Sequence, residues 1–381
     1  MAGVMADDAA RLTVIVPAFN EALRLSERAT RLEVAVEDGV LCPHTTELIV
    51  VDDGSTDETG WRAEELLAAT FPRLRVLRLH DNAGKGAAVR LGTAAATAPV
   101  VLFMDADMSV DPTQIPRLVK AIGPADLAIG SRSHDESVVE NDGMQRIIMG
   151  RTFSMLVSAL TNMPFRDTQC GFKAFRTPLA RILFHLMRVQ RFAFDVELLC
   201  LARQLRMEIT EVEVHWREIG QSTVRSVVDP VSMTRDLLSI RRRREWPNLP
   251  ALTVTSWHGE RRRSPSRIVG ELYRALGPNY PIVIVSEDES MVLLPLCDPV
   301  EVQTVAANLR QLPTQLSVRE RSVSFSQLTE FAPFKWVDGE NDGFVVASHA
   351  NLSGLVTRMP TAGWESLRAN QSQPIMSRPR V

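Results

Sequence analysis

The first half of the chain alternates short apolar runs with longer amphipathic stretches. The apolar runs are rich in Val, Ile and Leu and are bounded by polar residues, which is typical of buried strands. The stretches between them carry apolar residues at helical spacing. The expected strands are 12–16, 48–51, 74–79, 100–104 and 127–129, and the expected helices are roughly 21–38, 57–69, 85–96 and 112–122. Strands that alternate with helices predict right-handed crossovers and a parallel, doubly wound α/β sheet.

The alternation ends after Gly130. Residues 131–143 are polar, and we expect a mobile loop there. Beyond it the pattern predicts helices over 144–160, 194–205 and 231–240 and a strand over 211–216. From Arg235 to Arg267 nine arginines face three acidic residues, with several prolines among them. We interpret residues 1–245 as one domain and 246–266 as a basic linker.

The remaining residues, 267–381, are expected to form a small α+β domain. Helical patterns cover 265–276 and 300–310, and a hairpin joins 282–285 to 291–294. The acidic tip of that hairpin, 287–289, is most simply a polar turn. The tail after Asn370 is expected to be frayed, and the sequence assigns this domain no role.

Composition narrows the function classes. With 45% hydrophobic and 23% charged residues and a formal net charge of −3, the chain is ordinarily globular, which argues against nucleic acid as the main partner. The four cysteines lie far apart, which is typical of reduced thiols. The amino terminus lacks the layout of a signal peptide, and no apolar stretch approaches the roughly eighteen residues of a membrane helix. We therefore expect a cytoplasmic protein.

The most informative polar motif is Asp105-Ala106-Asp107, directly after the apolar run 99–104. Residues i and i+2 of an extended chain point to the same side, so the two carboxylates converge at the carboxyl end of a strand. Open α/β sheets bind their ligands at that edge. Two hard oxygen donors suit Mg²⁺ or Mn²⁺ held partly by substrate phosphates. Alone, the motif would equally fit a turn with capping aspartates.

Three further strand ends carry polar residues suited to a nucleotide. Residues 17–21 follow the first strand, and residues 51–57 follow the second, where a carboxylate could accept a hydrogen bond from a base. Residues 81–86 follow the third, where glycines would let backbone N–H groups approach a phosphate beside Lys85. Each segment alone could be a cap or a tight turn. All four together predict a nucleotide-binding edge.

These segments resemble glycosyltransferase family 2, whose members are inverting enzymes with the GT-A fold. The resemblance rests on Val-Pro-Ala-Phe-Asn-Glu, Val-Asp-Asp-Gly-Ser-Thr-Asp, Asn-Ala-Gly-Lys-Gly and Asp-Ala-Asp, in that order. Segments further along are similar to the dolichyl-phosphate β-glucosyltransferase branch of polyprenyl-phosphate glycosyltransferases, and the resemblance covers about 11–245. These segments are 130–132, 167–173, 194–197, 216–219 and 236–241.

The resemblance implies a metal-dependent transfer of a hexose, with glucose favoured, from a nucleotide-diphosphate sugar to polyprenyl or dolichyl phosphate. UDP-glucose is the favoured donor and GDP-mannose the alternative. Asp105 and Asp107 would carry Mg²⁺ or Mn²⁺ on the diphosphate, and Ser109 stands where mannosyl relatives often have Gln. The other substrate-binding positions implied at the strand ends are Pro17, Ala18, Glu21, Asp52, Asp53, Gly84 and Lys85.

The acceptor decides how much activation the nucleophile needs. A hydroxyl requires a positioned general base, whereas a phosphate monoester, which ionises near pH 6, is already nucleophilic at neutral pH. Arg132 and Lys173, with Arg151 and Arg166 as further candidates, could bind an acceptor phosphate. Asp167 could act as the base or orient the nucleophile. The sequence leaves both roles open, and Arg132 and Asp167 are the predicted catalytic pair.

Two other functions stay open. A family 2 enzyme could act on a small molecule, peptide or protein selected by the C-terminal domain, and a nucleotide-sugar-binding module could lack catalysis altogether. The basic segment 241–263, with Trp246 and Trp257, could also contact an anionic membrane surface peripherally, placing the protein at the inner face of a membrane.

Overall fold

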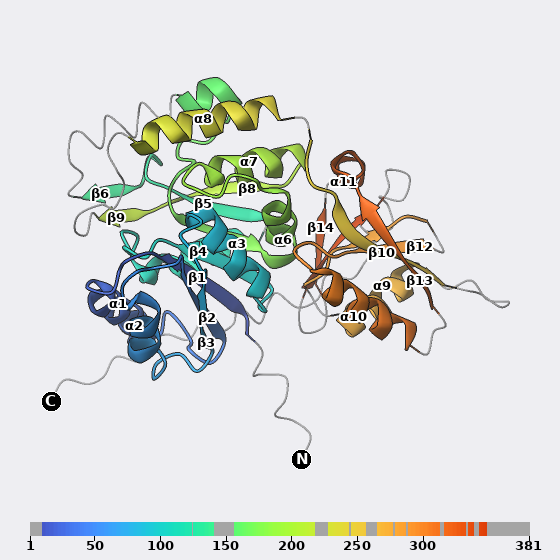
Figure 1. Cartoon of the computed structure of the whole chain (residues 1–381), viewed down its shortest axis with the longest axis horizontal. Helices are drawn as coiled ribbons and strands as arrows, with labels where there is room; N and C mark the ends of the chain where they lie inside the picture. Colours follow the sequence, from blue (N-terminus) through green and yellow to red (C-terminus); the bar gives the residue numbers. More distant parts are fainter. Residues whose placement is uncertain are drawn as a thin grey trace, which may run out of the picture.

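The computed structural model contains two β-sheets that share one long hydrophobic core (Figure 1). It describes residues 10–123, 125–140, 156–217, 228–243, 245–256, 265–276, 279–286, 289–312, 316–332, 334–338 and 343–348. No helix in these ranges combines the length and the apolar character needed to cross a membrane.

The first sheet has seven strands in the order β3-β2-β1-β4-β7-β5-β8. The strands are β1 Leu12–Ala18, β2 Thr46–Asp52, β3 Leu74–Arg78, β4 Val100–Met104, β5 Leu127–Ser131, β7 Phe172–Arg176 and β8 Ile209–Glu213. Neighbours are parallel except at β7, which is antiparallel to both β4 and β5. The carboxyl ends of β1, β2, β4 and β5 therefore meet at one edge.

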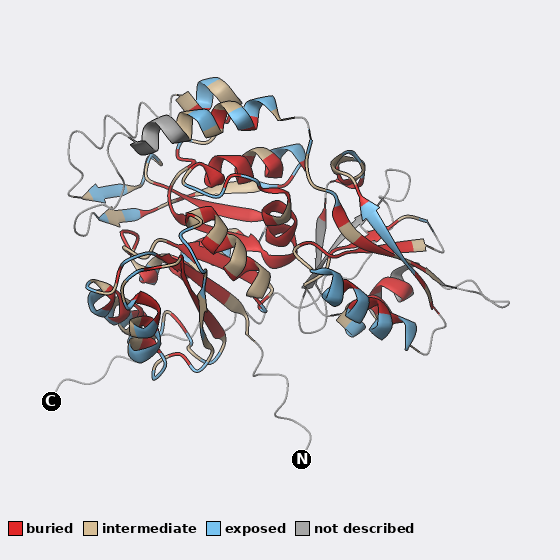
Figure 2. Cartoon of the chain, viewed as in Figure 1, coloured by how far each residue is buried: buried red, intermediate tan, exposed pale blue. Residues whose placement is uncertain are grey.

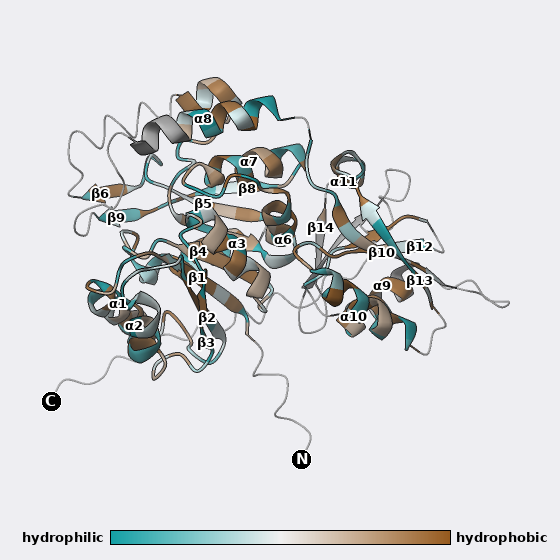
Figure 3. Cartoon of the chain, viewed as in Figure 1, coloured by the Kyte–Doolittle hydropathy of each residue, from teal (hydrophilic) through white to brown (hydrophobic). Residues whose placement is uncertain are grey.

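Both faces of this sheet are buried, because successive side chains of a strand point to opposite faces. Ile49 and Val51 of β2 belong to one core and Leu48 and Val50 to the other. The strands are among the apolar, brown elements of Figure 3. The helices of this half are α1 Leu25–Glu37, α2 Thr59–Leu67, α3 Lys85–Ala95, α4 Ile115–Ala121 after the 3₁₀ turn Pro112–Gln114, α6 Thr177–Leu186, α7 Phe194–Gln204 and α8 Val228–Arg242.

A short parallel ribbon stands beside the carboxyl edge. It pairs β6 Val138–Glu140 with β9 His215–Arg217. Figure 1 shows the ribbon on the side of the molecule opposite the second sheet.

The second sheet has six strands in the order β13-β10-β12-β11-β15-β14. They are β10 Leu249–Ser256, β11 Ile282–Ile284, β12 Glu289–Leu293, β13 Leu316–Val323, β14 Lys335–Asp338 and β15 Gly343–Ser348, with helices α9 Pro265–Leu276, α10 Pro299–Arg310 and α11 Phe325–Phe331. Asp298 and Glu301 form a capping box that begins α10. One face of the sheet packs against α9 and α10 in a separate core.

Helix α6 joins the two halves. Every residue of α6 except His185 is buried, and the helix is drawn red in Figure 2. Leu183 of α6 shares its core with Phe103 of the first sheet and with Ala251 and Leu293 of the second. Because α6 is buried around its circumference, it has a covering layer on both sides.

Two polar side chains of α6 reinforce this junction. The Arg181 guanidinium donates to the carbonyls of Ala94 and Ala96, at 3.0 and 3.1 Å, and lies over the ring of Tyr280. His185 Nε2 is 2.9 Å from the Asn248 carbonyl, and its Nδ1 accepts from the Leu296 N–H at 3.2 Å. Burial lowers the pKa of His185, so the neutral ring holds both bonds.

The α/β fold class predicted from the sequence is confirmed, with corrections to its details. The antiparallel β7 and helix α6 were not expected, and the expected loop 131–143 contains β6. The interval 246–266, expected to be a linker, contains β10, because Leu249, Ala251, Leu252 and Val254 are buried. The domain boundaries themselves stay a prediction. Most of the expected helix 144–160 and the tail beyond 370 lie outside the described residues.

Candidate active site

A solvent-open cavity of about 320 Å³ lies at the carboxyl edge of the first sheet. Its wall comes from the end of β4 and the loop after it, the end of β5, the loop before β7, and β9. The lining residues are Met104, Asp105, Asp107, Met108, Ser109, Val110, Arg132, Gln169, Cys170, Gly171 and Trp216. Three of the sequence-predicted site residues, Asp105, Asp107 and Arg132, therefore meet in one cavity.

Asp105 and Asp107 present two carboxylates to this cavity. The chain turns sharply just after Asp107, where Met108 has a positive φ of 50°. The Asp107 carboxylate accepts a hydrogen bond from the Ser109 N–H at 3.0 Å. Burial, followed by repulsion from Asp105, raises the pKa of Asp107. Such a pair is stabilised by an added cation.

Gly171 makes room for this arrangement. The Asp105 N–H donates to the Gly171 carbonyl at 3.0 Å, and a Cβ at position 171 would overlap the Asp105 carboxylate. The described residues hold no cluster of three or more His, Cys, Asp or Glu side chains suited to a metal. Two convergent carboxylates with open space around them fit Mg²⁺ or Mn²⁺ whose remaining ligands come from substrate and water.

Lys85 begins helix α3, and its ammonium group forms an ion pair with Asp105. Burial alone would lower the pKa of Lys85, but attraction to Asp105 and Asp195 raises it overall, so the side chain stays charged. A cation is thus fixed next to the carboxylate that would hold a metal.

Asp53 is almost fully buried and binds the loop before α3. Its carboxylate accepts from the N–H of Ala83 at 2.8 Å and of Gly84 at 2.9 Å, and from the Asn82 amide at 3.2 Å. Burial raises the pKa of Asp53 despite these bonds. Because the Gly84 N–H is occupied, the expected contact from that group to a phosphate is not formed.

Gly84 is required for another reason. At a φ of 109°, a Cβ there would lie 2.6 Å from the Gln190 carbonyl. The glycine therefore permits close packing of the loop that precedes α7.

The other predicted nucleoside residues shape the first two strand ends. Asp52 is fully buried and accepts from the Ser55 N–H at 2.8 Å, and Ala18 accepts from the Asp53 N–H at 2.8 Å. Pro17 lies in the same buried end of β1. The carboxylate of Glu21 pairs with Arg24 at 3.3 Å. These contacts organise the edge, and nucleoside binding by these residues stays a prediction.

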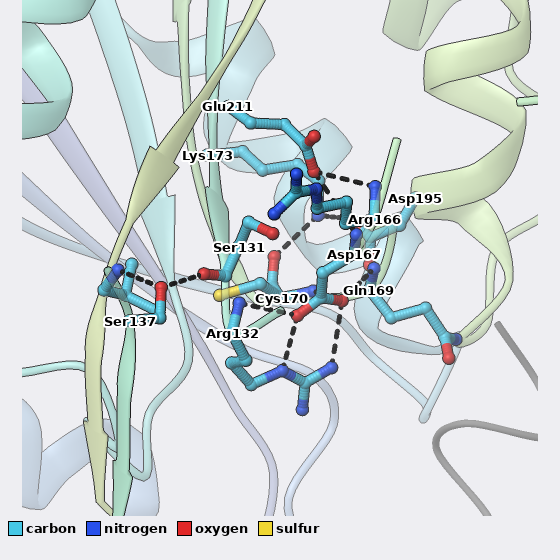
Figure 4. Close-up of polar contacts among 11 residues, drawn as sticks. Ser131, Arg132, Ser137, Arg166, Asp167, Gln169, Cys170, Lys173, Asp195 and Glu211 are labelled. Carbon is cyan, nitrogen blue, oxygen red and sulfur yellow. Dashed lines mark hydrogen bonds and ion pairs between the residues drawn. The ribbon is translucent and has the colours of Figure 1, made fainter. Parts of the chain in front are cut away.

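Arg132 and Asp167 form a bidentate ion pair, shown in Figure 4. Arg132 Nε and Nη2 donate to the two oxygens of Asp167 at 2.6 and 3.0 Å, and the Arg132 N–H adds a third bond at 3.1 Å. Asp167 also accepts from the N–H groups of Gln169 and Cys170. The Arg132 side chain is 37% exposed, against 4% for Asp167, so the cation faces the cavity and the anion lies behind it.

This pairing favours one of the two roles that the sequence left open for Asp167. Burial alone would raise the pKa of Asp167, but the Arg132 charge and hydrogen bonds outweigh it and lower the pKa to about 2. A carboxylate this acidic, with five donors around it, is a poor base at neutral pH. The geometry favours the other role, which is to orient.

Lys173 was predicted to bind an acceptor phosphate, and its position contradicts that. The side chain is fully buried, and its ammonium donates to the Cys170 carbonyl at 2.6 Å and pairs with Asp195 at 2.8 Å. It also lies 5.7 Å from the centroid of the Phe103 ring. Lys173 therefore supports the cavity wall from beneath.

Other residues were only partly anticipated. Gln169, Gly171 and Trp216 line the cavity, and each belongs to a segment that the family resemblance marked without giving it a role.

Arg166 is outside the cavity and pairs with Asp135 at 2.6 Å. Glu197 accepts from the Arg188 and Val189 N–H groups and pairs with Arg243. Arg151 lies outside the described residues.

Comparisons with known proteins identify the family of this chain. Residues 13–182 match the family model "Glycosyl transferase family 2". A dolichyl-phosphate beta-glucosyltransferase of Drosophila melanogaster is 38% identical over 248 residues, which cover 60% of this chain and 74% of that protein. The protein of the same name from Homo sapiens is 36% identical, covering 61% of this chain and 75% of its own length. The chain belongs to glycosyl transferase family 2.

The predicted family is thereby confirmed, and this family 2 glycosyltransferase shows the α/β fold expected for it. A more remote likeness is to a crystal structure of glucosyl-3-phosphoglycerate synthase from Mycobacterium tuberculosis, in complex with Mn²⁺, UDP and phosphoglyceric acid. It is 21% identical with a TM-score of 0.47, covering 63% of this chain and 82% of that chain. A likeness at this level says nothing about the ligands of this chain.

Proposed function

We propose that this family 2 glycosyltransferase moves a hexose, with glucose favoured, from a nucleotide-diphosphate sugar to the phosphate of a polyprenyl phosphate. The observation that carries the proposal is the Arg132 guanidinium, which is held by Asp167 and exposed to the cavity that Asp105 and Asp107 also line. The names of the similar proteins from fly and human support glucose and a lipid phosphate. UDP-glucose is the favoured donor, and GDP-mannose is the alternative.

The donor end of the cavity is built for a diphosphate. One cationic side chain, Lys85, lies beside two carboxylates, Asp105 and Asp107, which leaves one formal negative charge. We infer that Asp105 and Asp107 hold Mg²⁺ or Mn²⁺. Such an ion would neutralise charge that develops on the departing diphosphate. Lys85, at the start of α3, adds a positive charge beside it.

Among the described residues, the acceptor end holds no available base, which favours an acceptor that is already ionised. Asp167 has a pKa of about 2, and burial raises the pKa of Cys170 to about 12, so neither takes a proton from a hydroxyl at neutral pH. Among the described residues that line the cavity, the remaining carboxylates are the pair assigned to the metal. A phosphate monoester needs no proton removed above pH of about 6.

The chemical step follows from these positions. One oxygen of the acceptor phosphate forms a bond to the anomeric carbon, and the bond from that carbon to the diphosphate breaks. The nucleoside diphosphate leaves with the electron pair. Because donor and acceptor approach from opposite sides, the configuration inverts. Arg132 binds and orients the acceptor, and Asp167 fixes Arg132.

The alternative in which the C-terminal residues select a soluble acceptor has no support in the cavity. All the lining residues that belong to the described part of the chain lie between 104 and 216, and Figure 1 shows the second sheet on the far side of α6. Peripheral membrane contact through 241–263 stays a prediction. Arg241 and Arg242 are exposed, but Arg243 is used in contacts with Glu197 and Trp246. Arg244 and residues 257–264 lie outside the described ranges.

A panel of acceptors tests the proposal. The purified chain is incubated with UDP-glucose and Mn²⁺, and glucosyl transfer is measured to a polyprenyl phosphate, to the matching polyprenol, and to glycerol 3-phosphate. We expect transfer to the polyprenyl phosphate, none to the polyprenol, and loss of transfer with a chelator. Efficient transfer to the polyprenol would contradict the role given to Arg132, and preference for glycerol 3-phosphate would replace the lipid with a soluble phosphate.

A further inference from the structure

Trp216 is an apolar residue of the cavity wall whose main chain is held by contacts on both sides. Its neighbour His215 exchanges two hydrogen bonds of 2.7 Å with the side-chain amide of Gln114. Its other neighbour, Arg217, donates its N–H to the Ser109 carbonyl at 2.8 Å. Trp216 itself bridges to Val110 and pairs with a residue of β6. The main chain is thus fixed on both sides of a side chain that faces the cavity.

The proposed reaction fixes where the hexose must lie. The sugar is bonded to a diphosphate near Asp105 and Asp107, and it is attacked by an acceptor held at Arg132. Its anomeric carbon therefore lies between these groups, inside the one cavity that all three line.

We propose that Trp216 is a specificity-determining residue for the hexose, with its indole packing against the apolar C–H face of the pyranose ring. The inference rests on the proposed function and adds to it a residue of the cavity wall that discriminates between hexoses. An aromatic face buries apolar area at little cost in side-chain entropy. Ser109 and Gln169, which line the same cavity, supply hydroxyl and amide groups for the sugar hydroxyls.

The fixed backbone makes this wall selective. An aromatic side chain on a fixed backbone packs well against one ring stereochemistry. An epimer with an axial hydroxyl would then clash with this side chain or leave that hydroxyl without a hydrogen-bond partner. Apolar contacts of this size typically discriminate about 10-fold to 200-fold between substrates. The expected selectivity between glucose and galactose donors therefore depends on the side chain at 216.

Ligand binding to two matched variants tests the inference. Trp216→Leu removes the indole, and Trp61→Leu makes the same change on α2, at a side chain that is 59% exposed and outside the cavity. Dissociation constants for UDP and UDP-glucose, each with Mn²⁺, are measured by calorimetry. In Trp216→Leu we expect UDP affinity within about twofold of wild type and UDP-glucose affinity about tenfold weaker. Trp216→Phe should recover most of the loss, and Trp61→Leu should match wild type.

The pattern separates two kinds of failure. Equal losses of UDP and UDP-glucose in Trp216→Leu would overturn the inference, as would unchanged binding of both, or a change in acceptor KM alone. Binding of neither ligand by the wild type would instead overturn the proposed function, and this inference with it. A glucose-to-galactose preference that survives in Trp216→Leu would also contradict the role of Trp216.

Discussion

Five hydrogen bonds converge on the carboxylate of Asp167, two from the Arg132 side chain and three from backbone N–H groups. Because these bonds favour the ionised form, the folded-state pKa of about 2 lies below the ordinary value of 3.8. The ionised Asp167 carboxylate therefore stabilises the folded state above pH of about 4, and this contribution is lost as the pH falls towards 2. A shift of this size corresponds to about 2 kcal/mol.

The variant Asp167→Asn tests this linkage. Its free energy of unfolding should be lower than that of wild type at pH 7, and the difference should shrink as the pH falls from about 4 to 2. Urea denaturation at several pH values measures it. A difference that stays constant over this range would show that the charge of the Asp167 carboxylate does not contribute to the free energy of unfolding.

The same variant separates positioning from base catalysis. If Asp167 only orients Arg132, Asp167→Asn should raise the acceptor KM by about tenfold and leave the shape of the pH–rate profile unchanged. Steady-state kinetics between pH 5 and 9 decide this. Loss of an ascending limb in the variant would return the general-base role to Asp167.

Lys173 shows why single residues are hard to assign from sequence. Lysines are rarely fully buried unless they are paired, so a site near solvent was the reasonable expectation. The partner, Asp195, is twenty-two positions away in the chain, and only the fold brings the two together at 2.8 Å. Asp105, Asp107 and Arg132 were predictable because each directly follows a strand whose apolar run is plain in the sequence.

At the scale of elements, the loop before β7 connects the two ends of the cavity. Asp167 lies in this loop, and Gly171 ends it against Asp105. Replacing Gly171 by Ala would place a Cβ on the Asp105 carboxylate. We expect Gly171→Ala to weaken Mn²⁺-dependent binding of UDP-glucose at least tenfold, measured by calorimetry.

A glycine outside the site is the control for this change. A Cβ at Gly123, just after α4, would meet only the Lys120 carbonyl at 3.3 Å. Gly123→Ala should bind the donor like wild type. Normal donor binding by Gly171→Ala would show that Asp105 can move aside, and the proposed rigid metal ligand would be wrong.

The missed elements have a physical explanation. Strand β7 contains Lys173 and Arg176, which make its sequence look amphipathic, yet all five of its residues are buried. Asp195 pairs with the lysine, and the Ile122 carbonyl accepts from the arginine. Strand β10 was not predicted, because the interval that contains it includes prolines and is flanked by arginines. Strands β1, β2 and β4 were predictable because each contains an uninterrupted apolar run, namely 14–18, 48–51 and 100–104.

At the scale of the whole molecule, the shared core across α6 predicts cooperative unfolding. Leu183 contacts a core that includes residues of both sheets, and Arg181 and His185 bind groups on both sides of the junction. Differential scanning calorimetry of the full chain should therefore show one transition. Two separate transitions would mean that the second sheet folds as an independent domain.

The central claim is that one cavity joins a metal-held sugar donor to a phosphate held by Arg132. The most direct test is glucosyl transfer from UDP-glucose to polyprenyl phosphate with Mn²⁺ by wild type, Asp107→Asn and Arg132→Met, with thermal unfolding as the control for folding. The account predicts transfer by wild type and a loss of at least a hundredfold in each folded variant. Transfer at the wild-type rate by either variant would contradict it.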